Sequence, residues 1–453
     1  MADTEKQFNG ITEGVIWQQL ILFLIPLFFQ SVFQQIFGIA DAVIVGQGVG
    51  KYALGAVSST SNLTKLFLNL FQGFCGGASI IVGQAWGARD EEKVHRTVHT
   101  AFAFALAGGA LTALFCIPMT PYFLRIMRVP ADMAPYSDIY TRIIFFGFIG
   151  VFLYDTGAGI LRAIGDSKRP FYYLVASLAL NVVLNLLFVL VFRWGVAGVA
   201  ISTAISHFVS AALVMQRLCR ADNAARLFLR RIRFYKNELS RTVRLGIPMA
   251  ISGILYSISN IAIQSTVNSL GTDVIAGRSV TSNITSVIWS FYDAVGIAAS
   301  TFAAQNYGAG RPDRVRGSVR SCITVSAAII LPVCAFIFVL IGPLARIFIQ
   351  DPVVIGYAAY AARLEVPFLI FYLFGEVFTA SIRGCGETLR PMLLTLIGTC
   401  GFRVLWVAVI HVVWSPTLFN VTIGYPVSWF FHSALVSLYY FFGKWRERLR
   451  EEA

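Results

Sequence analysis

Long apolar segments alternate with short charged segments along almost the whole chain. The apolar segments lack the strict period-two alternation of half-buried strands, and about 20 helical residues suffice to cross a hydrocarbon core of roughly 30 Å. Helices are expected because backbone polar groups in lipid must be satisfied within the segment. The pattern therefore predicts an all-α integral membrane protein with twelve transmembrane helices, at residues 16–45, 55–84, 97–118, 138–160, 171–192, 196–216, 246–269, 276–306, 319–341, 357–382, 391–412 and 418–443.

The charged residues indicate how these helices are oriented. Only 13% of the chain is charged, against about a quarter in soluble proteins. With the N-terminus placed in the cytoplasm, the inner loops and tails hold 26 of the 36 Lys and Arg residues, and the outer loops hold five. This asymmetry predicts a multi-pass protein of the cytoplasmic (inner) membrane with both termini inside. The net charge of +13 then reflects topology and contact with anionic lipid head groups, and we expect no nucleic-acid partner.

The longest and most basic loop, residues 217–245, divides the chain into two related halves. A single offset of 221 residues relates three pairs of positions, which are Arg162 and Arg383, Gly50 and Gly271, and Gln84 and Gln305. We therefore predict two pseudo-symmetric six-helix lobes: an N-lobe at 15–216, a basic cytoplasmic linker at 217–245 and a C-lobe at 246–443. An even number of helices in each half makes the repeats parallel, an architecture that recurs in transporters.

Polar residues at membrane depth gather on three helices of the first half. Asp41 is an ionisable residue within a span, which by default makes it a functional candidate. Asn181 and Asn185 lie four residues apart on one helical face, Thr203 follows on the next span, and Tyr140 lies near one end of the fourth span. Together these groups suit either a carboxyl that binds a proton or an oxygen cage for a small hard cation. For the Asn and Thr residues, hydrogen bonding between helices is an equally good explanation.

The second half carries polar stripes of its own. Residues spaced four apart on residues 246–269 and on residues 357–382 would face a cavity or a neighbouring helix rather than lipid. Glu376 and Asp155 are 221 residues apart, and we weigh a structural role and a transport role equally for them. The residues that we predict to line a substrate cavity are Gln34, Tyr256, Asn260, Gln264, Asp293, Tyr372 and Glu376.

No catalytic or metal-binding pattern emerges from the sequence. The seven cysteines form no pair at metal-ligand spacing, and we expect them to pack as small apolar residues. The loops contain no phosphate-binding glycine pattern and no nucleophile–base set. We therefore expect no enzymatic activity, no cofactor and no structural metal.

With these features the chain resembles the multidrug and toxic compound extrusion (MATE) family, over residues 15–443. Each motif is weak alone, but together they occur in order and on the expected spans. The motifs are Gly38–Asp41, Gly83–Ala88, Leu161–Asp166, Asn181–Asn185, Gly198–Thr203, Gln305–Gly310 and Arg383–Gly384.

The resemblance implies a V-shaped antiporter that expels drugs and metabolites, often cationic, in exchange for Na⁺ or H⁺. It implies an N-lobe cation site at Asp41, Asn181, Asn185, Thr203 and Tyr140. It also implies that Pro26 lies where the first helix bends.

Two departures from the family pattern affect these implications. Many members have Asp where this chain has Asn185, so a single carboxylate remains and the coupling ion stays open. Members with a C-lobe cation site have acids where this chain has Tyr256 and Tyr372, so the resemblance implies no C-lobe ion site here.

Our prediction is a monomeric secondary active transporter that exports small organic molecules and uses Na⁺ or H⁺ as coupling ion. The alternative is a lipid-linked oligosaccharide flippase of the same broad superfamily. A flippase for large anionic head groups should line its cavity with several basic residues. Few basic residues lie near membrane depth, namely Lys65, Arg142, Arg278, Arg363 and Arg403.

Overall fold

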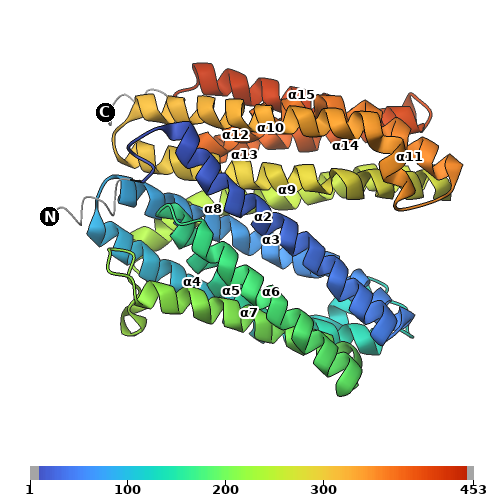
Figure 1. Cartoon of the computed structure of the whole chain (residues 1–453), viewed down its shortest axis with the longest axis horizontal. Helices are drawn as coiled ribbons and strands as arrows, with labels where there is room; N and C mark the ends of the chain where they lie inside the picture. The colour runs from blue at the N-terminus through green and yellow to red at the C-terminus, as the bar shows by residue number, and fades with distance from the viewer. Residues whose placement is uncertain (1–9, 446–453) are drawn as a thin grey trace. The chain divides into compact units, whose positions relative to one another are not determined.

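The computed structural model describes residues 10–445, apart from the side chains of residues 51 and 62. Over this range the secondary structure is helical (Figure 1), and twelve helical spans are long and apolar enough to cross a membrane. This confirms the predicted all-α fold with twelve spans. The two tails that the sequence places in the cytoplasm, residues 1–9 and 446–453, lie outside the described residues.

The first six spans are formed by α2 (Ile16–Gly48), α3 (Lys51–Gly87), α4 (Glu91–Ile126), α5 (Ala134–Ala163), α6 (Lys168–Leu186) with the π-helix η1 (Leu187–Val191), and α7 (Gly195–Cys219). A short 3₁₀-helix, η2 (Leu229–Arg231), follows. The last six spans are formed by α8 (Lys236–Asn268), α9 (Thr272–Gly308), α10 (Pro312–Arg346), α11 (Pro352–Glu365) with η3 (Val366–Phe368) and α12 (Leu369–Gly384), α13 (Leu389–Thr395) with the π-helix η4 (Leu396–Gly401) and α14 (Phe402–Val412), and α15 (Leu418–Phe442).

Most helices extend beyond the apolar segments that predicted them. α8 begins at Lys236, ten residues before the predicted span and inside the segment expected to be a linker. Polar residues can extend a helix beyond the hydrocarbon core, because side chains and backbone groups there can form hydrogen bonds with water. Hydropathy therefore locates the membrane-spanning part of a helix but not its ends.

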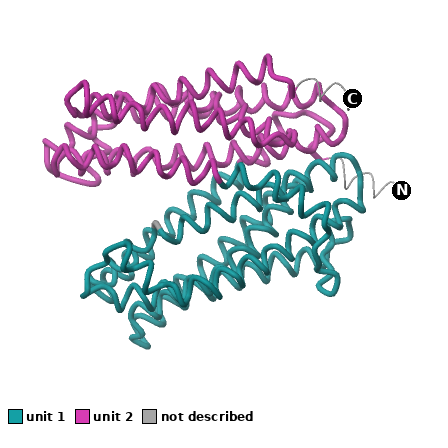
Figure 2. The backbone as a smooth tube through the Cα atoms, turned by 180° about the vertical axis from the view of Figure 1, so that it is seen from behind, with its two compact units in different colours: residues 1–8, 25–250 teal, residues 9–24, 251–453 magenta. Residues whose placement is uncertain are grey.

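The chain divides into two compact units, drawn in teal and magenta in Figure 2. Unit 1 contains residues 25–250, and unit 2 contains residues 10–24 and 251–445 of the described chain. The change of unit falls within α2 and within α8, the first helix of each repeat. Pro26 lies inside α2 two residues after the change, and Pro248 lies inside α8 two residues before the end of unit 1.

The two units repeat their backbone conformations at the offset found in the sequence. Gly50 precedes α3 with φ 113° and Gly271 precedes α9 with φ 100°, while Gly165 and Gly386 adopt φ 97° and 89° in the turns that follow α5 and α12. Residues with a side chain avoid this region, so glycine is required at each of these positions. The repeated glycines therefore mark repeated backbone geometry.

One helix lies at the centre of each unit. In unit 1, α5 contacts α3, α4 and α7, and in unit 2 the corresponding α12 contacts α9, α10 and α15. The core of unit 1 is aromatic at this point, with the rings of Phe71 and Phe152 stacked 3.6 Å apart. The polar residues described next lie mainly on α2, α6 and α7 of unit 1 and on α8, α13–α14 and α15 of unit 2.

Candidate functional sites

The structure brings the predicted polar residues of the first half together in unit 1. Asp41 lies on α2, Asn181 and Asn185 on α6, and Thr203 on α7. Both asparagines are 0% exposed, and their spacing of four residues places them on one face of α6. Tyr140 on α5 lies within electrostatic range of Asp41 and packs against both apolar clusters of this region. We call these five residues the Asp41 cluster.

The hydrogen bonds of the Asp41 cluster centre on Asn185. Its side-chain nitrogen donates to Asp41 Oδ1 at 2.6 Å and to Asn181 Oδ1 at 2.6 Å. Asn181 Nδ2 lies 3.2 Å from Thr203 Oγ1, and Thr203 donates its own proton to the carbonyl of Val199 at 2.9 Å. With the Asn181 amide turned over, its nitrogen lies 3.2 Å from Asp41 Oδ1 instead. In either orientation α2, α6 and α7 are joined through one polar group.

Ser202 lies against this cluster as well, although the sequence did not lead us to predict it. Its hydroxyl is buried and contacts Asn185 Oδ1. Thr203, the predicted residue, is its direct neighbour in the chain. Ser202, Ser206 and Ser210 recur at steps of four, so the serine stripe was the signal that could have identified Ser202.

The Asp41 cluster contains an acidic group but no basic group. Among the described residues no basic side chain pairs with Asp41, and the surrounding groups are amides and hydroxyls. A carboxylate at membrane depth without a counter-charge is costly when ionised. Such a group favours binding of a proton or a small cation that neutralises it. No group of three or more His, Cys, Asp or Glu in residues 10–445 could hold a metal ion.

In unit 2 the structure gathers two of the predicted cavity residues around an arginine. Asn260 Oδ1 accepts from Arg403 Nη1 at 2.7 Å, and the Tyr256 ring lies 5.1 Å from the Arg403 guanidinium. Arg403 also donates through Nε to Ser428 Oγ at 3.0 Å and lies 4.9 Å from the Tyr425 ring. We call Arg403, Asn260, Ser428, Tyr256 and Tyr425 the Arg403 cluster. It joins α8, α14 and α15.

A second arginine lies beside the Arg403 cluster. Arg278 on α9 forms an ion pair with Glu365 on α11 at 2.5 Å, and its guanidinium lies 5.1 Å from the same Tyr425 ring. Glu365 is within electrostatic range of Arg403 as well. One carboxylate is thus ion-paired with Arg278 and lies close enough to Arg403 to interact with it electrostatically.

Tyr372 and Glu376 lie together on α12. Tyr372 donates to Glu376 Oε2 at 3.5 Å and packs against Trp289 at 4.9 Å. Glu376 is in electrostatic range of Arg383, seven residues later, and its partner in the repeat, Asp155, is in range of Arg162 at the same spacing. This shared arrangement fits the structural alternative for the two acids, because each acid lies close enough to interact electrostatically with the arginine seven residues later.

The remaining three predicted cavity residues are exposed and, like Tyr372 and Glu376, are not part of either cluster. Gln34 is exposed on α2, and Gln264 is exposed and donates to Asn268 at 2.9 Å. Asp293 is exposed on α9, within electrostatic range of Glu376. The α8 stripe that contains Tyr256, Asn260 and Gln264 therefore changes from interior to surface along its length.

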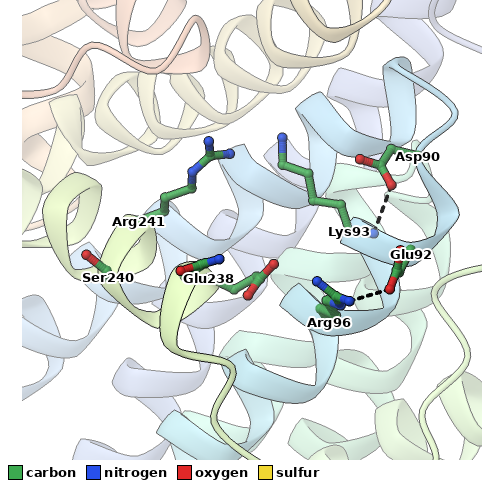
Figure 3. Close-up of a pocket in the computed structure, with 8 residues that line it drawn as sticks. Asp90, Glu92, Lys93, Arg96, Glu238, Ser240 and Arg241 are labelled. Carbon is green, nitrogen blue, oxygen red and sulfur yellow. Dashed lines mark hydrogen bonds and ion pairs between the residues drawn. The ribbon is translucent and has the colours of Figure 1, made fainter.

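A charged cavity of about 570 Å³ lies within unit 1 (Figure 3), away from the predicted residues. It is formed where α4 and α8 begin, on the side predicted to be cytoplasmic. Asp90 caps α4 by accepting from the Lys93 backbone at 3.0 Å. The lining residues are Asp90, Glu92, Lys93, Arg96, Asn237, Glu238, Ser240 and Arg241. Acidic and basic groups are mixed in this cavity, so it shows no preference for one sign of charge.

Twelve membrane-spanning helices in two repeated units, with polar clusters at membrane depth, define a multi-pass membrane transporter. The chain belongs to the MatE family, because the sequence model of that family matches residues 26–187 and again residues 248–409. The same model matching twice agrees with the internal repeat.

Curated relatives carry names that refer to drug resistance. The chain is 30% identical over 443 residues to "Probable multidrug resistance protein YoeA" of Bacillus subtilis, which covers 96% of this chain and 95% of that protein. It is 25% identical to "Probable multidrug resistance protein NorM" of Thermotoga maritima, over 96% of this chain and 94% of that protein.

Solved structures share the fold along the whole chain. One is described as the outward-facing conformation of a multidrug resistance MATE family transporter of the MOP superfamily, with a TM-score of 0.88, 23% identity and coverage of 98% of each chain. Another, a MOP superfamily transporter from Pyrococcus furiosus, has a TM-score of 0.89 and 22% identity, and covers 99% of this chain and 98% of that chain. At these identities the likeness establishes the fold. The relatives and neighbours are transporters, and the flippase alternative is not favoured.

Proposed function

We propose that this protein is a secondary active antiporter that exports small organic compounds in exchange for a cation bound at Asp41. The names of its relatives support efflux of drug-like compounds. The single observation that carries the antiport mechanism is the Asp41 cluster, in which a carboxylate at membrane depth accepts from Asn185 and has no basic partner among the described residues.

Coupling requires that the cation bind with different affinity to two conformations of the protein. In alternating access, the substrate path opens to one side of the membrane at a time. Neutralising Asp41 changes the cost of holding that side chain among α2, α6 and α7, and therefore changes the relative free energies of the two conformations. Substrate binding shifts the same equilibrium in the opposite direction, so that one ligand replaces the other.

The donors around Asp41 favour a proton over Na⁺. Asn185 directs an N–H toward Asp41 Oδ1 at 2.6 Å. A metal ion bound to that oxygen from the same side would have to displace this N–H group. A proton can be added to the carboxyl without rearranging the amides. Na⁺ needs several oxygen ligands, which in this cluster requires the asparagine amides to turn their oxygens inward.

We further propose that the protein acts as a monomer in the cytoplasmic (inner) membrane with both termini in the cytoplasm. The orientation is supported by the distribution of Lys and Arg, 26 of which lie in the loops and tails predicted to be on the inner side. The positive-inside rule gives this orientation.

The test is transport by the full chain in proteoliposomes, with a proton gradient and a Na⁺ gradient imposed separately. We expect a cationic dye such as ethidium to accumulate inside the vesicles when an imposed proton gradient drives protons out of them. We expect no accumulation with a Na⁺ gradient at constant pH. Transport driven by Na⁺ alone would retain antiport and replace the coupling ion. Transport that responds to neither gradient would refute antiport.

A further inference from the structure

Arg403 is a fully buried charge whose hydrogen-bonding capacity is only partly used. Its side chain is 0% exposed. Nε and Nη1 donate to Ser428 and Asn260, which are neutral acceptors on α15 and α8. Nη2 is buried without a hydrogen-bond partner among the described residues. Packing between helices accounts for the first two contacts, but it does not account for a guanidinium edge left unpaired at membrane depth, where such groups are expensive.

The charge around Arg403 is not balanced by its neighbours. Glu365 is within electrostatic range of both Arg403 and Arg278, and it is already bound to Arg278 at 2.5 Å. The three residues together carry one positive charge in excess. The Tyr256 and Tyr425 rings, 5.1 and 4.9 Å from the guanidinium, stabilise that charge through cation–π contact but do not neutralise it.

The surplus positive charge lies on helices that correspond to those of the Asp41 cluster, although not at the position equivalent to Asp41. α8, α13–α14 and α15 correspond to α2, α6 and α7 under the offset of 221 residues. Arg403 corresponds to Val182, the residue that follows Asn181 of the Asp41 cluster. The two equivalent sets of three helices therefore surround a carboxylate in unit 1 and a guanidinium in unit 2.

From this arrangement we propose that unit 2 binds the carboxylate of an aromatic organic substrate at Arg403. A guanidinium presents a planar fork of donors that matches the two oxygens of a carboxylate. The neighbouring side chains suit the rest of such a molecule, because a connected row of rings leads from Tyr425 through Trp429 and Trp289 to Tyr372.

Tyr256 and Asn260 contact the guanidinium from α8, and both are partly exposed. A ligand that approaches Arg403 from this side would meet these two residues first. In this proposal the Tyr256 ring turns aside, and the carboxylate of the substrate binds Nη2. Arg403 then has a charged partner in place of the neutral tyrosine ring. The inference rests on the proposed export function, since it names the class of compound exported, and it adds that compounds with a carboxylate are preferred over compounds with positive charge alone.

Equilibrium binding to the purified full chain in a neutral detergent, without any ion gradient, tests this proposal. The probes are rhodamine 110, which has a free carboxylate, and rhodamine 123, which is its methyl ester, followed by fluorescence anisotropy. We expect the wild-type protein to bind rhodamine 110 about tenfold more tightly than rhodamine 123, the gain of one charged hydrogen-bonded contact. Equal affinity of the wild-type protein for the two probes would overturn the proposal.

Variants assign the preference to Arg403. Arg403→Gln should remove the preference for rhodamine 110 while leaving the affinity for rhodamine 123 within about twofold, and Arg403→Lys should keep part of it, since Lys retains charge without the fork. Arg363→Gln, at an exposed position of α11, is the matched control and should bind like the wild type. If either Arg403 variant is folded and loses affinity for both probes equally, Arg403 has only a structural role. Asp41→Asn should keep the binding preference, so a failure of antiport and a failure of this proposal are distinguishable.

Discussion

Unit 1 and unit 2 repeat one arrangement of helices around opposite charges. In unit 1, α2, α6 and α7 surround Asp41 with amides and hydroxyls, and Asn185 donates to the carboxylate at 2.6 Å. In unit 2, the corresponding α8, α14 and α15 surround Arg403, and Asn260 accepts from the guanidinium at 2.7 Å. In each case an asparagine on a neighbouring helix binds the charged group. Asn185 uses its amide nitrogen to contact the carboxylate, and Asn260 uses its amide oxygen to contact the guanidinium.

The difference shows which features the repeat has kept and which have diverged. The backbone is kept, as the left-handed glycines Gly50 and Gly271 show. The interior side chains differ in sign of charge, and a buried charge is costly unless something pairs with it. This difference is the basis of our proposals that unit 1 binds a cation or proton and that unit 2 binds an anionic group. Three experiments with substituted proteins test this contrast.

The largest effect is expected at Asp41. Asp41→Asn preserves the shape of the side chain but removes the group that takes up a proton or cation, so gradient-driven dye transport in proteoliposomes should fall to the rate seen without a gradient. The control is Asp138→Asn, which removes a partly buried ion pair with Arg142 in the same unit. Gradient-driven transport by Asp41→Asn at the wild-type rate would show that unit 1 does not hold the coupling site.

A smaller effect, on stability, is expected at the shared carboxylate of unit 2. Glu365→Gln leaves Arg278 and Arg403 without their common partner and should destabilise the protein by about 3 kcal/mol, because it leaves an uncompensated buried charge. Thermal unfolding in detergent, followed by tryptophan fluorescence, measures the change.

The double variant Arg278→Met with Glu365→Leu serves as the comparison for that measurement. It removes the pair as a whole and should recover most of the lost stability. Unchanged stability of Glu365→Gln would mean that the positive charges are balanced elsewhere, which would weaken the contrast between the units.

The smallest effects are expected at the repeated glycines. A Cβ added at Gly50 or at Gly271 would meet open space, so the cost of Gly50→Ala and of Gly271→Ala comes from the backbone alone. We expect about 1–2 kcal/mol for each, and the same value within error, from thermal unfolding. Gly342→Ala, in open space inside α10, should be neutral or slightly stabilising. Clearly unequal costs at Gly50 and Gly271 would show that the repeats differ in backbone constraint as well as in charge.

Much of the Asp41 cluster could be predicted from the sequence. Asp41 is recognisable because an acid in an apolar span is costly and is seldom found there without a function, and Asn181 and Asn185 share a face through their spacing. Ser202 was missed because a helix places it about 100° from Thr203, and the sequence does not show which of the two directions faces the neighbouring helix. Gln264 was wrongly grouped with the interior residues Tyr256 and Asn260, because periodicity places all three on one face of α8 but does not show that only part of this face is buried.

The contacts of Arg403 could not be read from the sequence. Asn260 and Arg403 are 143 residues apart, and periodicity indicates the face of a helix but not its partner. The same limit applies to Arg278 and Glu365, two residues on separate spans that only packing joins into an ion pair.

By itself, the sequence determined the twelve spans and the repeat, because lipid imposes a length and a composition on every segment that crosses it, and because a duplicated chain keeps its register. It also determined that Asp41 is an acid at membrane depth. Only the tertiary structure decided which charges are paired. Pairing depends on which helices lie within a few ångströms of each other, and that is set by packing over the whole unit rather than by any local pattern of residues.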